Sequence, residues 1–136
     1  MAIVSTKGAY GLTAILILAK ENNKLLQIKQ IATKGDIPPN YLEQILVVMK
    51  KSGIVESIRG ANGGYRLLRD KSDISVYEIL SSLDCCVAFT DAKTKGSILE
   101  PFWEDTQKKM EKLFSLSIKD LEIFLEKNSK NIMYYI

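Results

Sequence analysis

Residues 57–67, SIRGANGGYRL, set one arginine beside three glycines, a combination that can bind phosphate in two ways. Glycine lets backbone N–H groups approach an anion closely, which would make the loop a phosphate cradle. Alternatively, a hairpin tip would carry Arg59 into a nucleic-acid groove. No Lys-Ser or Lys-Thr pair follows Gly64 and the spacing is not G-x-G-x-x-G, so the sequence fits neither common phosphate loop. The strand-like residues on both sides favour the hairpin, with strands at residues 54–58 and 65–68.

Two helices joined by a tight turn are expected before this hairpin. The first lies in the stretch of residues 25–35, with Ile28, Ile31 and Ala32 at helical spacing, and stops at Gly35. The second begins at Pro39 and stops at Gly53. At 100° per residue, the second helix has a packing face and a presented face. The packing face holds Leu42, Ile45, Leu46 and Met49, and the presented face holds Asn40, Gln44, Val47 and Lys51. Helix, turn, helix and hairpin in succession are the order of a winged helix-turn-helix.

The rest of the chain is expected to be helical. A core helix capped by Thr6 comes first, and its apolar run is too short to span a bilayer. Ser75 and Glu78 form a capping box that starts a short helix after the hairpin. A long amphipathic helix follows, whose apolar stripe is expected to form a dimer and consists of Leu99, Phe102, Trp103, Met110, Leu113 and Phe114. A last helix, capped by Ser117, is expected to turn Leu121, Phe124 and Leu125 inward.

These elements predict a mainly α fold with a small β-wing. We expect a winged helix-turn-helix DNA-binding domain over residues 1–84, a connecting loop over 85–98 and a helical dimerisation region over 99–136. Residues 1–75 hold 11 Lys and Arg against 6 Asp and Glu, a net charge of +5, whereas residues 76–136 hold 8 against 10, a net charge of −2. This asymmetry favours an anionic partner such as nucleic acid for the N-terminal half.

Three stretches carry a resemblance to a known family: TKGAYGLTAILILA, then IPPNYLEQILVVMKKSGIVESIRGANGGYRL, then ISVYEILSSLD. In this order the sequence resembles the Rrf2 family of transcriptional regulators over most of its length. The resemblance implies double-stranded DNA as a partner and a homodimer in which the long C-terminal helix crosses its partner. It also implies one DNA-reading head on each subunit.

Carried over by position, the resemblance places the DNA contacts in the second helix of the motif and in the wing. They are Pro39, Asn40, Tyr41, Glu43, Gln44, Lys50, Lys51, Arg59 and Gly60. Gln44 can pair with adenine and Glu43 can accept a hydrogen bond from cytosine. The lysines suit phosphates, and Arg59 suits phosphates or a narrow minor groove. The alternative for each residue is a solvated surface position, and for Tyr41 it is packing under the turn.

Cluster-binding members of this family carry three cysteines in the connection, and the sequence departs from that pattern. Its two cysteines, Cys85 and Cys86, stand side by side before the loop, and it has no histidine. Because iron–sulfur clusters normally need four ligands, we expect no iron–sulfur cofactor and no metal held by one chain. The pair is interpreted as buried apolar side chains, as a redox-sensing thiol, or as ligands pooled across a dimer. Two adjacent cysteines build no disulfide framework, which favours the cytoplasm.

The expected function is that of a dimeric, sequence-specific DNA-binding transcriptional regulator, with repression as its effect. Enzymatic activity is not expected, because no nucleophile-base pair can be assembled with histidine and no zinc motif is present. The alternative is a protein-interaction module whose winged helix docks a regulatory protein partner. Val47, an apolar residue on the presented face, favours that alternative, although the same side chain could meet a thymine methyl group.

Overall fold

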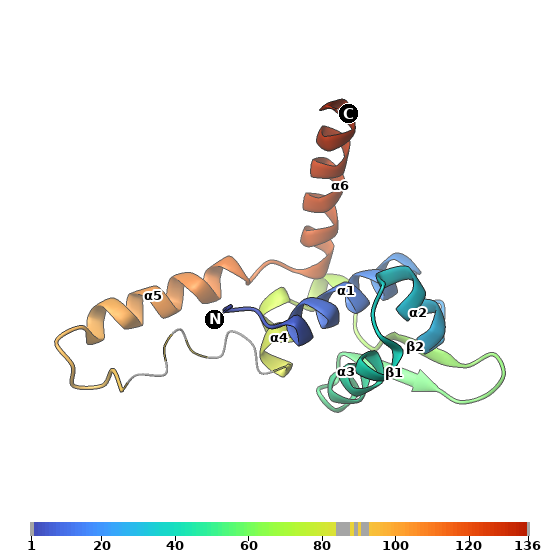
Figure 1. Ribbon diagram of the computed structural model, residues 1–136, viewed down its shortest axis with the longest axis horizontal. Helices are drawn as coiled ribbons and strands as arrows, with labels where there is room; N and C mark the ends of the chain where they lie inside the picture. The colour runs from blue at the N-terminus through green and yellow to red at the C-terminus, as the bar shows by residue number, and fades with distance from the viewer. Residues whose placement is uncertain (1, 84–87, 89, 91–92, 136) are drawn as a thin grey trace.

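The computed structural model describes residues 2–83, 88, 90 and 93–135, with side chains described up to residue 129 (Figure 1). The elements are α1 (Thr6–Lys20), α2 (Ile28–Gly35), α3 (Pro39–Lys51), β1 (Val55–Ile58), β2 (Gly64–Leu67), the 3-10 turn η1 (Lys71–Asp73), α4 (Val76–Ser82), α5 (Glu100–Leu113) and α6 (Ile118–Tyr135). Together with one two-stranded antiparallel sheet, they confirm a mainly α fold with a small β-wing. None of the helices in the described ranges is both long and apolar enough to cross a membrane.

The core forms around α1, which contacts α2, α3, α4, α6 and β2. Ile15 of α1 and Ile45 and Leu46 of α3 are fully buried in one continuous apolar cluster. Gly11 permits the close approach of α4's C-terminal end, because a Cβ at this position would lie 2.2 Å from Leu83 Cδ1. Burial of these side chains is the main force that holds α3 on the body. The orientation of its outer face follows from that packing.

β1 and β2 form the expected hairpin, the wing, in which Ile58 pairs with Gly64. The first strand begins one residue later than predicted and the second begins and ends one residue earlier. Leu26 bridges the second strand: its N–H donates to Tyr65 O at 2.9 Å, and Tyr65 N–H donates to Leu26 O at 2.7 Å. Gly64 has a φ of +152°, and a Cβ there would lie 2.5 Å from Leu26 O. This glycine therefore serves close backbone packing of the wing.

Two predicted helix starts need correction. Ser5, not Thr6, caps α1, because the Ser5 hydroxyl accepts the backbone N–H three residues on. Ser75 does cap α4 through the Glu78 N–H at 3.0 Å. The Glu78 carboxylate does not complete a capping box, however, because it binds both terminal nitrogens of Arg69.

α5 and α6 extend away from the body in different directions (Figure 1). Within α5 only Met110 is buried, and α6 is anchored by Ile118 at its first position. Phe124 and Leu125 are 57% and 43% exposed, so the prediction that they face inward was wrong. Past its first turns α6 rises off the body (Figure 1).

The chain returns from α5 to the place where it entered α4. Val76 N–H donates to Leu116 O at 2.9 Å, and Ile118 N–H donates to Ile74 O at 2.8 Å. The segment before α4 and the segment before α6 are therefore clasped together by backbone hydrogen bonds. This clasp holds the start of α4 beside the segment that joins α5 to α6.

Candidate nucleic-acid interface

α3 divides its side chains between the core and the outside as the sequence predicted. Leu42, Ile45, Leu46 and Met49 are 0% exposed. Asn40, Glu43, Gln44, Val47 and Lys51 are all exposed. Because the buried face fixes the rotation of α3 about its axis, the amide and carboxylate groups are presented on one outer surface. These are the groups that pair with base edges in a DNA major groove.

Tyr41 packs on the body at the start of this surface. Its ring contacts that of Tyr10 in α1 edge-on, with centroids 5.6 Å apart and planes at 77°. Tyr41 nevertheless stays 36% exposed. Tyr41 thus packs in part against α1, and a DNA contact by the exposed part of the side chain stays a prediction.

The two lysines at the end of α3 differ in their surroundings. Lys50 Nζ donates to Ser57 Oγ of β1 at 2.7 Å, so this side chain ties α3 to the wing. Lys51 is exposed and has no ion pair with any described residue. Lys51 is thus the lysine more available to a phosphate.

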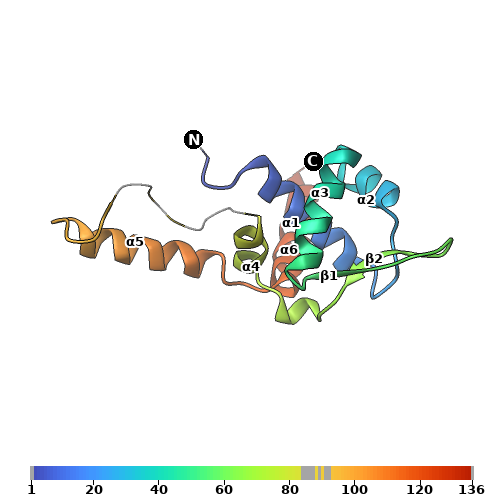
Figure 2. The same ribbon diagram turned by 90° about the horizontal axis from the view of Figure 1, so that it is seen from below.

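Arg59 and Gly60 begin the turn between the two wing strands, and both are exposed. Figure 2 shows the hairpin reaching out to one side of α3. Gly60 has a φ of +123°, a conformation that residues with a side chain rarely adopt. The turn therefore needs glycine directly after Arg59, which leaves the arginine as the cation at the tip of the wing.

A cleft of about 440 Å³ opens between the wing and the start of α2. It is lined by Gln27, Ile28 and Lys29 on one side and by residues 58–60 and 63–65 on the other. Gln27 Nε2 donates to Ala61 O at 3.5 Å across it. Sequence reasoning missed Lys29, because only the backbone pairing of Leu26 with Tyr65 brings this part of α2 beside the wing.

Two other arginines near the wing are occupied by carboxylates. Arg66 Nε lies 2.6 Å from Glu56 Oε1 across the two strands. Arg69 donates to both carboxylate oxygens of Glu78, at 2.7 and 2.6 Å, and to Asp73 O at 2.8 Å. The hydrogen bonds to Glu78 raise the pKa of Arg69 above its usual value. The charges of both arginines are thus compensated by carboxylates of the chain itself.

The apolar stripe of α5 is divided between the chain's own core and the surface. Met110 is 6% exposed, and Trp103 and Phe114 are half-buried. Leu99, Phe102 and Leu113 are 50%, 58% and 74% exposed. Three large apolar side chains of the predicted dimerisation set are therefore at least half exposed in the described part of the chain.

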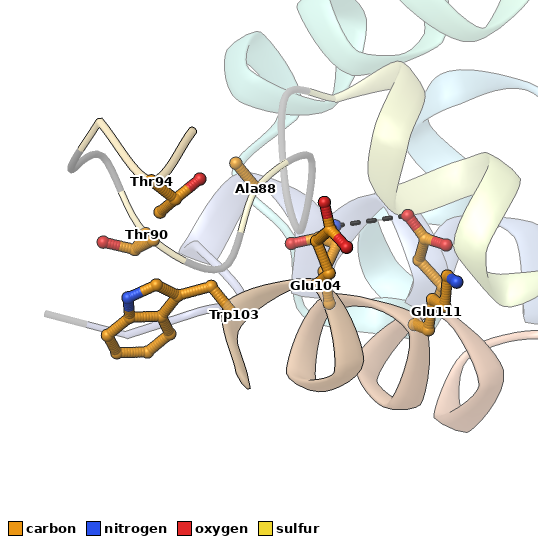
Figure 3. Close-up of a pocket in the computed structure, with 8 residues that line it drawn as sticks. Ala88, Thr90, Thr94, Trp103, Glu104 and Glu111 are labelled. Carbon is orange, nitrogen blue, oxygen red and sulfur yellow. Dashed lines mark hydrogen bonds between the residues drawn. The ribbon is translucent and has the colours of Figure 1, made fainter. Parts of the chain in front are cut away.

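A hollow of about 590 Å³ lies between the connection and another face of α5 (Figure 3). Its lining consists of Ala88, Thr90, Thr94, Trp103, Glu104, Gln107, Lys108 and Glu111, with Gln107 Nε2 donating to Glu111 Oε1 at 3.2 Å. These side chains offer hydroxyl, amide, carboxylate and ammonium groups. Across the residues that the structure describes, no group of three His, Cys, Asp or Glu side chains could hold a metal ion. Cys85 and Cys86 lie outside the described residues.

Comparison with known proteins finds relatives that are transcriptional regulators. A family model described as Rrf2, iron-dependent transcriptional regulator, matches residues 4–122. The HTH-type transcriptional regulator CymR of Bacillus subtilis is 31% identical over 138 residues, covering 98% of this chain and 99% of CymR. The HTH-type transcriptional regulator IscR of Cereibacter sphaeroides is 38% identical over 84 residues, 60% of this chain. The match spans only 54% of the length of that IscR.

A solved structure agrees with these relatives. IscR of T. potens has a TM-score of 0.77 and 34% sequence identity, covering 92% of this chain and 89% of that one. The winged architecture, the long family match and the end-to-end similarity to CymR all point the same way. The chain belongs to the Rrf2 family of transcriptional regulators.

Proposed function

We propose that this chain is a homodimeric, sequence-specific DNA-binding transcriptional regulator that acts as a repressor and works without an iron–sulfur cluster. The observation that carries the proposal is the outer face of α3 beside the wing. Asn40, Glu43 and Gln44 are exposed on a helix whose opposite face is fully buried. Such a helix can enter a major groove while Arg59 reaches a flanking phosphate or minor groove.

Selection of bound duplexes from a random pool, followed by footprinting, tests DNA recognition. We expect a site with two-fold symmetry, because a symmetric dimer presents two identical reading heads. We also expect the affinity to fall steeply with added salt, since each neutralised phosphate releases counterions. Failure to enrich any sequence, together with an affinity insensitive to salt, would refute the proposal.

Support for the homodimer comes from the exposed part of the α5 stripe. Leu99, Phe102 and Leu113 present apolar side chains to solvent along one side of α5, which a second copy of the same helix would cover. Sedimentation of the wild-type chain should therefore give twice the mass of one chain at micromolar concentration.

Repression requires nothing beyond tight binding, because a protein that occupies a promoter excludes the polymerase. Transcription in vitro from a promoter that carries the selected site should fall as the protein is added, and a rise would identify an activator. Such a regulator acts in the cytoplasm, where bacterial relatives of this kind meet DNA. No catalytic role is proposed, since the relatives are transcriptional regulators and the sequence has no histidine to serve as a general base.

The donor chemistry supports a cofactor-free protein, even though the family description refers to iron. Iron–sulfur clusters are held by thiolates, with imidazole as the occasional replacement. The chain has two adjacent cysteines and no histidine. The described lining of the hollow beside α5 adds carboxylates such as Glu104 and Glu111 but no thiol. One chain therefore lacks the four ligands that such a cluster normally needs.

Anaerobic purification tests this part of the proposal. We expect a colourless protein without stoichiometric iron or acid-labile sulfide that still binds its selected duplex. A brown preparation whose visible absorption is lost in the Cys85→Ser, Cys86→Ser double variant would overturn it. If the pair is instead a thiol switch, peroxide lowers the affinity, reductant restores it, and the double variant no longer responds.

A second candidate is a protein-docking module, favoured by Val47. This residue is 45% exposed on the outer face of α3, where an apolar side chain suits a protein partner as well as a thymine methyl group. Val47→Asn separates the two functions. Loss of a base preference for thymine supports DNA reading, whereas unchanged DNA binding with loss of a co-purifying protein supports docking.

A further inference from the structure

We propose that Lys29 and Arg59 together hold one phosphate of the DNA backbone in the cleft between the wing and the start of α2. The inference rests on the proposed DNA-binding function and adds a residue outside the second helix and the wing. It extends the interface from α3 and the wing tip onto α2.

The cleft is built from backbone that the fold holds in place. The reciprocal hydrogen bonds of Leu26 with Tyr65, at 2.9 and 2.7 Å, lock the chain just before α2 to the second wing strand. Gln27 Nε2 adds a bond to Ala61 O in the turn. Lys29 and Arg59 line the cleft that these bonds define, from opposite elements.

Two cations that line one cleft without a carboxylate give this cleft a positive charge. Neither Lys29 nor Arg59 has an ion pair with a described residue, and no carboxylate lines the cleft. By contrast, Arg66 and Arg69 are paired with glutamates at 2.6 Å, as is Lys34. Two uncompensated cations beside one cleft create a local positive potential that favours an anion from outside.

The position of the cleft favours a DNA phosphate over a free anion. Arg59 belongs both to the cleft and to the wing tip, so a duplex that meets the tip brings its backbone to the cleft. Apart from Gln27 and Tyr65, the remaining lining residues are apolar or glycine, so the cleft has few further polar groups with which to select a small solute. A phosphate that arrives as part of a bound duplex needs no such selection.

Salt titration of duplex binding gives the first test. Lys29→Ala and Arg59→Ala should each weaken binding to the selected duplex and to a random duplex, and reduce the slope of log affinity against log salt by about one unit at most. Lys20→Ala, an exposed lysine at the end of α1, is the matched control and should leave the slope unchanged. Thermal melting of each variant should match that of the wild type.

Replacement of single phosphates by neutral methylphosphonates in the selected duplex gives the decisive test. At one phosphate per half-site, the replacement should weaken wild-type binding and abolish the difference between the wild type and both variants. Effects of Lys29 and Arg59 that map to different phosphates would overturn the proposal. So would wild-type affinity in Lys29→Ala, or a saturable response to inorganic phosphate without any methylphosphonate effect.

The duplex-binding measurements distinguish failure of the shared phosphate contact from failure of the proposed DNA-binding function. If the wild type enriches no duplex, DNA recognition itself is refuted. If the wild type binds its duplex with a steep salt dependence and Lys29→Ala binds equally well, only the shared phosphate contact is refuted.

Discussion

The winged body buries most of its large apolar side chains, whereas the C-terminal helices leave several of theirs exposed. In the body, Ile15, Ile45 and Leu46 are 0% exposed because each helix is covered by another. In α5 and α6, Leu113 and Phe124 are 74% and 57% exposed. Most large apolar side chains of the body are thus buried within one chain, whereas α5 and α6 leave several of theirs exposed.

The largest effect is expected from charges placed on the uncovered face of α5. Phe102→Glu combined with Leu113→Glu should give a monomer in sedimentation, because burying four carboxylates in an apolar interface is strongly unfavourable. Affinity for the selected duplex should fall by more than about 100-fold, since two linked reading heads bind far more tightly than one. Met110 is left unchanged because it belongs to the chain's own core.

Lys112→Glu is the control for this variant, since Lys112 is exposed on α5 outside the apolar stripe. It should remain dimeric. A wild-type chain that sediments as a monomer at micromolar concentration would remove the basis of the comparison.

Truncation of one apolar side chain in each region compares how much the packing of the body and of α6 contributes to the free energy of unfolding. In the monomeric double variant, Leu46→Ala should lower the free energy of unfolding by about 2–5 kcal/mol, because it leaves a cavity among fully buried neighbours. Phe124→Ala in the same background should change it by less than about 0.5 kcal/mol. Urea denaturation followed by circular dichroism measures both. Equal losses would mean that α6 is packed as tightly as the body.

Within the body, Gln44→Ala should affect sequence recognition and leave stability alone. Removal of the amide should reduce the preference for one base in each half-site by about 1–3 kcal/mol. Lys51→Ala should instead weaken binding to all duplexes alike, because a phosphate contact carries no sequence information. Competition binding against a set of single-base variants of the selected duplex distinguishes the two. A full base preference in Gln44→Ala would show that Gln44 faces only solvent.

The smallest effect is expected at η1, where the body meets α6 through the ion pair of Lys71 with Glu122 at 2.8 Å. The Ser72 hydroxyl and N–H donate to Asp70 Oδ1 at 2.6 and 2.8 Å. These hydrogen bonds, that of the side chain first, lower the pKa of Asp70. The carboxylate therefore adds stability above its unfolded pKa of about 3.9, and this stability is lost as the pH falls through the lower folded value.

Asp70→Asn tests this sign, because asparagine keeps the cap and removes the charge. The melting temperature of the wild type should exceed that of the variant slightly at neutral pH, and the two should converge in strong acid. A difference that stays constant down to about pH 2 would contradict the expected lowering of the Asp70 pKa.

The sequence predicted the winged body well because its signals are local. Helical periodicity located the buried face of α3, and Asn62-Gly63 located the wing turn. Lys29 was missed because its place beside the wing depends on the long-range pairing of Leu26 with Tyr65.

The inward orientation of Phe124 failed for a related reason. Periodicity shows that a helix has an apolar face, but not whether that face meets its own chain. At α1, Ser5 and Thr6 are equally good caps by composition, and only the backbone conformation distinguishes them.

The backbone hydrogen bonds between the starts of α4 and α6 hold Phe114 about one length of α4 away from Leu83, and within α5 only Met110 is buried in the body. α4 has seven residues, so its two ends lie about 10 Å apart. A linker of about four residues spans that distance. Excision of α5 with the connection should therefore leave a monomeric reading head with α6 still attached. A dimerisation helix from another protein, inserted between the same two points, would give the DNA-binding domain a different partner. The outer face of α3 would stay unchanged.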